Sequence, residues 1–419
     1  MQRIVVLATV AALASACRES RQSTASTTAP AADATARPNY YQDVYPIIAK
    51  NCIECHTSAN AISGRSLSSY DDVVASAPHL GHVVGAREMP PWGVDNAGAC
   101  GEWRDPRWLS NTDVATILAW LEGGTPEGDP DKRPQLSPKT APLARLSGPP
   151  TRTLTFGGGY QPTPGSNIER CFVVDPQLSS DGYLTQLSLA PSTGIRQVTL
   201  FAIDSPAGEQ AARDLDAKDA APGYSCTGAR MPGAHILVGG TWNNPVVNLP
   251  DGTGMKVSTG QKLIAEVEYD ILHTSPDVVK LAVDLTLVPN ARPATWIEVR
   301  AQSIALAPNL VETTAQGQRV LPNQTSVLAL YPQMRRLGRS MDVSVDRPAG
   351  KARTCMMSQF HWTYDMLREP RLYATPRVIE AGSLVTLTCH YNTQGESRTI
   401  VDGVTPDDEE CAALLYTAD

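Results

Sequence analysis

Two cysteines and a histidine, Cys52, Cys55 and His56, stand close together in the order Cys-Ile-Glu-Cys-His. Thiols at this spacing can each form a thioether with a porphyrin vinyl group, and the adjacent imidazole then lies beneath the iron as an axial ligand. The motif therefore predicts one haem c, attached through Cys52 and Cys55 and ligated by His56. Structural zinc is the alternative, but it normally takes a second Cys/His pair within a few tens of residues, which the sequence does not supply.

Helical periodicity flanks the motif on both sides. Over 40–51, apolar residues recur at the spacing of one helix face: Tyr41, Val44, Tyr45 and Ile48. A second helix is predicted over 110–121, where Ser110 and Asp113 form a capping box and Leu109 begins a hydrophobic staple. Its apolar face consists of Val114, Ile117, Leu118 and Leu121, and two glycines follow it.

The sixth iron ligand is expected between these helices. Met89 is the first candidate, because two prolines follow it and would hold its loop against the haem; a thioether ligand raises the reduction potential. Core filling is the other role of a lone methionine, and His79 or His82 would give a bis-histidine iron of lower potential. Residues 39–128 resemble a single-haem cytochrome c domain, which implies a small all-α fold.

The first residues predict export. An apolar run over 4–13 is too short to span a bilayer, and it ends in small residues before Cys17. This pattern resembles the lipobox of bacterial lipoproteins, so we interpret 1–16 as a signal peptide, Cys17 as the lipidated N-terminus and 17–38 as a flexible tether. Cleavage without lipidation is the alternative. The arginine after Cys17 favours the periplasmic side of the outer membrane or the cell surface.

The cysteine count also fits an exported protein. With Cys17 assigned to lipid and two cysteines to haem, six of the nine remain: Cys100, Cys171, Cys226, Cys355, Cys389 and Cys411. An even number in an oxidising compartment predicts disulfides, each contributing about 2 to 4 kcal/mol. The sequence leaves their connectivity open.

Composition limits the classes of structure and partner. The chain has 419 residues, 33 prolines, 31 glycines and a net charge of −8, which indicates several compact domains with many loops. The acidic balance argues against nucleic acid as a partner and fits encounter with a basic periplasmic redox protein. A segment rich in proline, glycine and charged residues is expected to be a linker over 129–150.

From residue 151 onward, apolar residues no longer recur at the helical spacing and instead occupy alternate positions. Over 263–270 and 281–287, apolar residues alternate with charged or polar ones, which predicts strands. Similar runs occur at 198–203, 296–305, 326–331, 341–345 and 383–391. This length of short strands suits two all-β sandwich domains, 151–290 and 291–419.

The order of segments over 150–419 resembles the copper type II, ascorbate-dependent monooxygenases, the family of peptidylglycine alpha-hydroxylating monooxygenase. That resemblance implies two jelly-roll domains. In the first half it rests on the segments 196–201, Arg-Gln-Val-Thr-Leu-Phe, 249–254, Leu-Pro-Asp-Gly-Thr-Gly, and 264–269, Ile-Ala-Glu-Val-Glu-Tyr. In the second half it rests on the segments 333–338, Gln-Met-Arg-Arg-Leu-Gly, 360–362, Phe-His-Trp, and on Cys389 with 408–411, Asp-Glu-Glu-Cys.

The chain departs from this family at all six copper-ligand positions. Two adjacent histidines and a third before a tyrosine are replaced by Arg196, Gln197 and Glu268. His-x-His and a methionine are replaced by Gln333, Arg335 and Glu410. Arginine stays protonated, and a lone carboxylate or carboxamide substitutes poorly for imidazole at copper. The sequence therefore predicts a module without copper and without the family's monooxygenase chemistry.

Few histidines remain to build a different metal site. Of the seven in the chain, four follow residue 151: His235, His273, His361 and His390. They are widely separated in the sequence, so we expect each to be a hydrogen-bonded structural residue rather than part of a shared metal site.

The resemblance also bears on the cysteines. Cys389 and Cys411 match a disulfide that closes the second domain of the family. A bridge between Cys171 and Cys226 is expected in the first domain. Cys100 and Cys355 remain by elimination, and a bridge between them would cross domains.

Three functions are compatible with these observations. The favoured hypothesis is a lipid-anchored electron carrier, in which the haem ligated by His56 and Met89 exchanges electrons with a periplasmic partner and the β-sheet module serves docking or assembly. The second is a monooxygenase with an atypical copper site supplied with electrons by the cytochrome domain. The third is a binding or structural protein with a subsidiary haem.

Overall fold

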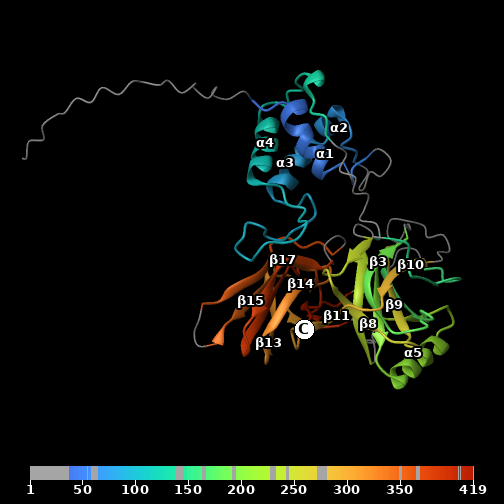
Figure 1. Cartoon of the computed structure of the whole chain (residues 1–419). Helices are drawn as coiled ribbons and strands as arrows, with labels where there is room; N and C mark the ends of the chain where they lie inside the picture. Colours follow the sequence, from blue (N-terminus) through green and yellow to red (C-terminus); the bar gives the residue numbers. More distant parts are fainter. Residues whose placement is uncertain are drawn as a thin grey trace, which may run out of the picture. The chain divides into compact units, whose positions relative to one another are not determined.

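The computed structural model describes residues 37–53, 55–57, 65–136, 146, 148–162, 167–190, 195–226, 233–241, 245–270, 281–348, 352–364, 369–403, 405 and 407–418. The predicted signal peptide, Cys17, the predicted tether up to residue 36 and His273 lie outside these residues. The described part is mostly β-structure in several sheets, preceded by a group of helices (Figure 1).

The helices before residue 123 share one apolar core. They are η1, a π-helical turn (Tyr40–Val44), α1 (Tyr45–Asn51), α2 (Tyr70–Ala75), α3 (Ala77–Gly85) and α4 (Asn111–Glu122); a 3-10 turn, η3 (Pro130–Lys132), follows. Fully buried side chains of this core include Val44, Ile48, Ile117 and Trp120. No helix in the described residues is long and apolar enough to cross a membrane.

The first predicted helix is present, and Val44 and Ile48 of its predicted apolar face are fully buried. Tyr41 and Tyr45, also predicted on that face, are half-buried, whereas Tyr40 and Ile47 are buried instead. The π-helical turn explains the difference, because the amide of Tyr45 donates to the carbonyl of Tyr40, five residues back, and this wider turn rotates the side chains.

The start of α4 confirms the predicted capping box. Ser110 Oγ accepts from the amide of Asp113 at 3.0 Å, and the Asp113 carboxylate accepts from the amide of Ser110 at 3.2 Å. This reciprocal pair satisfies amides that have no partner within the helix. Trp120, which is not on the predicted apolar face, is fully buried, and its indole donates to the carbonyl of Pro126 at 3.0 Å.

The strands up to residue 288 are interrupted by one helix. They are β1 (Arg152–Phe156), β2 (Asn167–Val174), β3 (Gly182–Leu189), β4 (Ile195–Ile203), β5 (Tyr224–Ser225), β6 (Ala234–Thr241), β7 (Val246–Asn248), β8 (Thr253–Val257), β9 (Leu263–Asp270) and β10 (Leu281–Val288). The helix is α5 (Pro206–Lys218), so the expectation of an all-β domain was wrong here. Ser205 caps it and Pro206 occupies its first turn, two ordinary start signals.

Further strands follow after residue 288. They are β11 (Arg292–Arg300), β12 (Ala305–Leu306), β13 (Thr313–Leu321), β14 (Thr325–Gln333), β15 (Gly338–Asp346), β16 (Thr354–Gln359), β17 (Arg371–Ile379), β18 (Ser383–Tyr391), β19 (Ile400–Val401) and β20 (Ala412–Ala418). The strand predicted over 296–305 ends earlier, at Arg300. There β13 passes so closely that a Cβ on Gly317 would lie 2.4 Å from the Arg300 carbonyl carbon.

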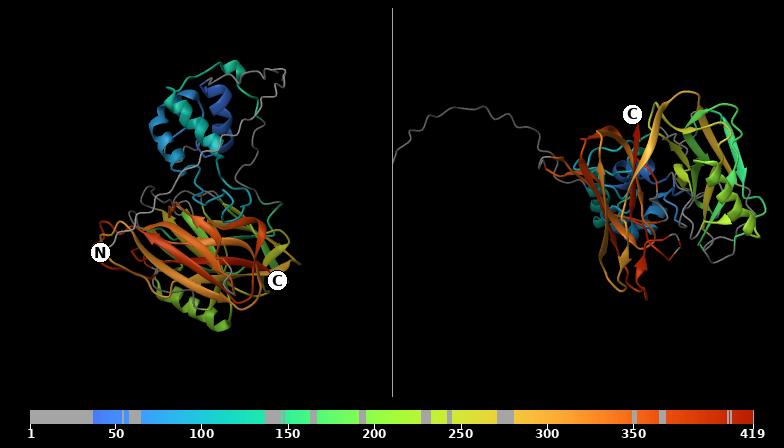
Figure 2. Two further views of the ribbon diagram at one scale, coloured as in Figure 1. Left: turned by 90° about the vertical axis from the view of Figure 1, so that its left-hand side faces the viewer. Right: turned by 90° about the horizontal axis from the view of Figure 1, so that it is seen from below.

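Three sheets account for most of these strands. The largest has the order β1-β10-β3-β8-β11-β20-β14-β17, with β7 paired to β3. A sheet of order β5-β2-β9-β4-β6 packs against its first half, and a sheet of order β13-β18-β15-β16 packs against its second (Figure 2). We name these layered halves the first and the second sandwich. A separate apolar core lies within each.

The two sandwiches share the largest sheet. β11 pairs in parallel with β8, which joins Ala294 to Met255 across the boundary expected at residue 290. The core of the first sandwich also includes Leu328 and Tyr416, which belong to strands of the second. Strand pairing and apolar packing therefore link the two halves directly.

Residues 92–108 lie between α3 and α4 in the sequence but pack into the second sandwich. We call them the connecting segment. Trp92, Val94 and Trp103 belong to the second sandwich core, and the Trp103 ring stacks on Tyr373 with centroids 4.5 Å apart. Val94 also forms an isolated β-bridge with Gln359. The range predicted for a cytochrome c domain thus contributes side chains to a β-sheet core.

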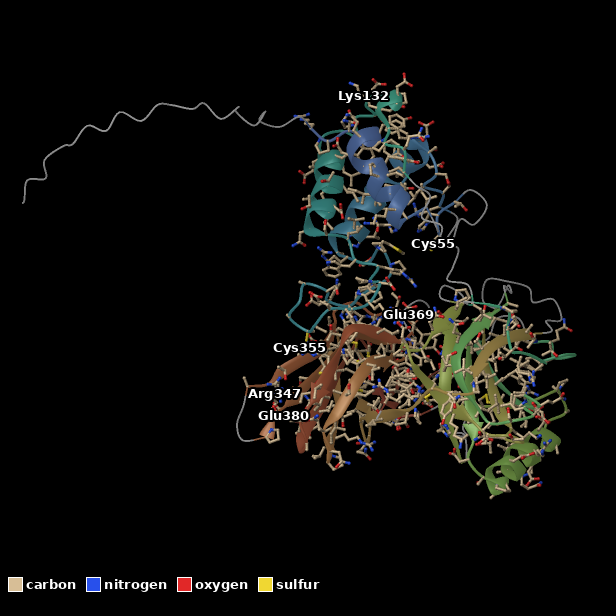
Figure 3. All side chains as sticks on the ribbon, in the orientation of Figure 1. Cys55, Lys132, Arg347, Cys355, Glu369 and Glu380 are labelled. Carbon is tan, nitrogen blue, oxygen red and sulfur yellow. A yellow bond between two sulfur atoms is a disulfide. The ribbon has the colours of Figure 1, made fainter. Side chains whose placement is uncertain are left out.

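Three disulfides cross-link the described residues. Cys171 pairs with Cys226 in the first sandwich, and Cys389 pairs with Cys411 in the second. Cys100 of the connecting segment pairs with Cys355, 255 positions later and labelled in Figure 3. These are the three pairs considered from the sequence, including the one left by elimination.

Candidate functional site

The Cys-x-x-Cys-His residues form a turn at the end of α1. The amide of Cys52 donates to the carbonyl of Ile48 at 2.8 Å, and the amide of His56 donates to the carbonyl of Cys52 at 3.0 Å. Neither Cys52 nor Cys55 belongs to one of the three disulfides. Figure 3 labels Cys55 in the helical part of the chain. The turn keeps both thiols and the imidazole within one short stretch of backbone.

The His56 ring has a defined orientation. Its Nδ1 lies 2.9 Å from the carbonyl oxygen of Arg65, and its own carbonyl accepts from the amide of Leu67 at 2.8 Å. Because a carbonyl oxygen can only accept, this contact places the ring proton on Nδ1 and the lone pair on Nε2. Metal-ligating imidazoles commonly donate their other ring N–H in this way. Two thiols and one oriented imidazole therefore fit haem c.

Cys52 lies against the apolar core of the helices. Burial raises the pKa of the Cys52 thiol to about 12, so the thiol stays protonated at neutral pH. A thioether sulfur carries no charge and suits the same surroundings.

Met89 lies in the loop that leaves α3. The amides of Glu88 and Met89 donate to the carbonyl of Val83 at 2.8 and 3.1 Å, and a cis peptide bond joins Met89 to Pro90. Met89 is half-buried and lines a small pocket together with Val84, Arg87, Trp92, Arg107, Trp108, Leu109 and Val114. The aliphatic members of this set also belong to the core against which Cys52 packs. The Met89 loop and the His56 turn are thus built on the same apolar core.

The two alternative axial ligands lie on the solvent face of α3. The His82 side chain is 71% exposed, with Nε2 3.9 Å from a carboxylate oxygen of Glu88. His79 is exposed as well. Of the three candidates, Met89 is the one that lines the pocket beside the helical core.

Three of the positions that the resemblance assigns to copper ligands lie on β4 and β9. Arg196 Nη1 is 2.8 Å from Glu268 Oε1, and both side chains are 5% exposed. The register of β4 against β9 shifts at Arg196, as in a β-bulge. Gln197 donates to the hydroxyl of Tyr331 at 2.8 Å, a contact between the two sandwiches. A buried ion pair and an interdomain hydrogen bond therefore occupy these positions.

The other three positions lie in the second sandwich. Arg335 Nη1 is 2.9 Å from a carboxylate oxygen of Glu169 on β2, and Glu410 lies 3.4 Å from Arg300. Gln333 is buried at the end of β14. Each set of three thus contains an arginine, whose fixed positive charge opposes a cupric ion. The donor sets at these positions do not fit copper bound in the manner of the family.

The later histidines do not gather into a metal site among the residues described. Each of the three that the structure describes has a hydrogen-bond partner: His235 with Asp204, His390 with Glu312, and His361, through its amide, with Gly93. Within the described ranges, no group of three or more His, Cys, Asp or Glu side chains could hold a metal ion.

One charged cluster next to the Met89 pocket was not foreseen. The Arg371 side chain is fully buried, its Nη2 donates to the carbonyl of Trp92 at 3.1 Å, and its guanidinium lies 4.3 Å from the centre of the Trp92 ring. Arg371 pairs with Glu369, which also lies 3.4 Å from Arg107. In the sequence, Glu-Pro-Arg before a strand is indistinguishable from a solvated turn, so nothing local marks the cluster.

Comparisons with known proteins identify no family. No protein-family model and no curated protein matches the chain. Among solved structures, a protein from Eubacterium rectale aligns at 10% identity over 60% of this chain and 69% of its own, with a TM-score of 0.19. A Paenibacillus xanthan lyase aligns at 10% identity over 69% of this chain and 28% of its own, with a TM-score of 0.16. Likenesses this weak carry no argument about fold or function.

Proposed function

We propose that the protein is an exported electron carrier that holds one haem c through Cys52 and Cys55, with His56 and Met89 as axial ligands. The observation that carries this proposal is the His56 turn, in which two thiols adjoin an imidazole whose Nδ1 is directed at a backbone carbonyl. Haem c bound there would supply reversible one-electron exchange. The Arg65 carbonyl orients the imidazole, and the proline-containing loop presents the thioether.

In this proposal the helical part is a cytochrome c domain and the β-sheet part is a module of two jelly rolls that lacks copper. Its support is the set of ion pairs at the former ligand positions, above all Arg196 with Glu268 and Arg335 with Glu169. These ion pairs link separate strands of the module. In this proposal the module therefore serves docking or assembly rather than oxygen chemistry.

Export is part of the proposal. Three disulfides support folding in an oxidising compartment. Lipidation of Cys17 would then anchor the chain on the periplasmic side of the outer membrane or at the cell surface. The net charge of −8 favours a basic periplasmic redox protein as electron partner.

The first test is elemental analysis of protein produced in a host that attaches haem c and receives copper. We expect one covalently bound iron per chain, no copper, a reversible haem couple, and no oxygen consumption with ascorbate. Copper bound at one or two ions per chain, together with ascorbate-dependent oxygen consumption, would contradict the copper-free module and favour a monooxygenase. Ligand retention by haem-free protein would favour a binding protein.

The sixth ligand is tested by Met89→Ala, with His82→Ala as the control. We expect Met89→Ala to remove the weak far-red absorption of methionine-ligated ferric haem and to lower the midpoint potential, because the thioether is lost. His82→Ala removes an exposed imidazole and should change neither. Far-red absorption that persists in Met89→Ala would show that another residue ligates the iron.

A further inference from the structure

The Met89 loop is held at one end by the helical part and at the other by the second sandwich. On the helical side, the carbonyl of Val83 accepts from the amide of Met89. Two prolines follow Met89, and each restricts the backbone between Met89 and Trp92. Trp92 is buried in the second sandwich core. The position of Trp92 therefore limits where the Met89 side chain can lie.

The buried charged cluster of Arg371 and Glu369 contacts the Trp92 end of the Met89 loop. Arg371 of β17 donates to the Trp92 carbonyl at 3.1 Å and packs on the face of its ring at 4.3 Å. The planar guanidinium can make both contacts at once, which a lysine ammonium cannot reproduce. Glu369, labelled in Figure 3, is 3% exposed and bonds Arg371, which keeps the guanidinium in this orientation.

The same cluster reaches the other side of the Met89 pocket. Glu369 pairs with Arg107 at 3.4 Å, and both Arg107 and Trp92 line the pocket together with Met89. Beyond the pocket, the disulfide between Cys100 and Cys355 fastens the connecting segment to β16. Two independent restraints from the second sandwich thus act on the segment that carries the pocket wall.

We infer that Arg371 and Glu369 are positioning residues for the Met89 sulfur, so that the second sandwich determines the sixth ligation of the haem. This inference rests on the proposed function. It assigns the β-sheet module a role in the redox site itself, through contacts made by residues 282 and 280 positions after Met89 in the sequence.

The test compares Arg371→Lys with Arg170→Lys in the full-length protein containing haem. Arg170 is a matched control, because it is also buried, pairs with a carboxylate, that of Asp219, at 2.7 Å, and packs over the ring of Tyr160 at 4.6 Å. Three properties are measured: far-red absorption of the ferric protein, the midpoint potential, and carbon monoxide binding to the ferrous protein. Far-ultraviolet circular dichroism confirms that each variant folds.

We expect Arg371→Lys to lose far-red absorption, lower the midpoint potential and allow carbon monoxide to bind, because a displaced Met89 leaves the sixth position open. Arg170→Lys should match the wild type in all three. If Arg371→Lys does not fold, Glu369→Gln and the double variant Cys100→Ser with Cys355→Ser are measured instead, with the same expected changes for each restraint removed.

The failures of the two proposals are distinguishable. Far-red absorption that survives in Met89→Ala refutes Met89 as ligand and so the proposed site. Far-red absorption that is lost in Met89→Ala but kept in folded Arg371→Lys and Glu369→Gln refutes the positioning role alone. Equal losses in Arg371→Lys and Arg170→Lys would also refute it, because general loosening of the fold would then explain the effect.

Discussion

Arg196 and Glu268 stand where the resemblance places two imidazole ligands, and their ion pair is almost completely buried. Bringing two charges out of water is costly, and the attraction between them offsets that cost only while both are present. Exposed pairs contribute much less, because water and salt screen them. The free energy of unfolding that is lost when one partner is replaced therefore distinguishes a buried pair that stabilises the fold from an exposed pair that does not.

Glu268→Gln should lower the free energy of unfolding by about 3 to 5 kcal/mol, because it removes the carboxylate charge that lies 2.8 Å from the buried Arg196 guanidinium. The control is Glu209→Gln, which breaks an exposed pair with Arg213 on α5 and should cost less than about 1 kcal/mol. Urea unfolding measures both. Equal costs for the two variants would contradict the structural role of the buried pair.

A second residue-scale prediction concerns pH. Burial raises the pKa of Glu409 from 4.5 to about 7, although its carboxylate accepts from the amides of Leu337 and Arg335 at 2.6 and 2.9 Å. Between these two pH values the folded state holds a proton that the unfolded chain has released. The free energy of unfolding contributed by Glu409 should therefore be greatest below pH 4.5 and fall as the pH rises to about 7.

Glu409→Gln should reduce the dependence of the free energy of unfolding on pH, because an amide keeps the acceptor oxygen but does not titrate. At about 1.4 kcal/mol per pKa unit, the difference in free energy of unfolding between wild type and variant should change by roughly 2 to 3 kcal/mol between pH 4.5 and about 7. Unfolding is measured at several pH values on both proteins. Parallel pH profiles would rule out a shifted Glu409.

At the scale of elements, most boundaries follow from local chemistry. The capping box of α4 and the Ser205-Pro206 start of α5 both mark helices whose N-terminal amides need acceptors. η1 also begins at a cap, since Asn39 Oδ1 accepts from the amide of Gln42 at 3.0 Å, but the helical periodicity did not predict that its wider turn buries Tyr40. Local signals thus predict where an element begins better than which face it buries.

Ser110→Ala should reduce the free energy of opening of α4 by about 1 kcal/mol, because the amide of Asp113 loses its acceptor. Thr112→Ala is the control, since Thr112 is exposed in the same turn and alanine favours the helix. Hydrogen exchange of the α4 amides measures both. A loss in Thr112→Ala as large as in Ser110→Ala would contradict the specific role of the cap.

At the scale of the whole molecule, contacts between described residues join the ranges 39–128, 151–290 and 291–419, which were expected to form separate domains. The largest sheet spans both sandwiches, and the connecting segment places Trp103 in the core of the second. The helical part and the β-sheet part are therefore not joined only by a linker. A substitution in the connecting segment, between α3 and α4, should therefore destabilise strands of the second sandwich.

Trp103→Ala should destabilise the second sandwich by about 3 to 5 kcal/mol, because a buried ring stacked on Tyr373 is removed. Trp120→Ala, equally buried but in the helical core, should act on α1 to α4 instead. Hydrogen exchange should accelerate in β16 and β17 for the first variant and in the helices for the second. Unchanged exchange in β16 and β17 of Trp103→Ala would contradict this account.

Short-range patterns in the chain were sufficient to locate the Cys-x-x-Cys-His turn, the α4 cap and many strands, including 383–391 with the bounds of β18. Each depends on residues a few positions apart, whose preferences act before any tertiary contact forms. The shared sheet, the burial of the connecting segment and the contact of Arg371 with Trp92 were decided by tertiary structure alone. They depend on complementary surfaces of residues far apart in the sequence, whose apolar and charged side chains resemble ordinary core and surface residues until the chain folds.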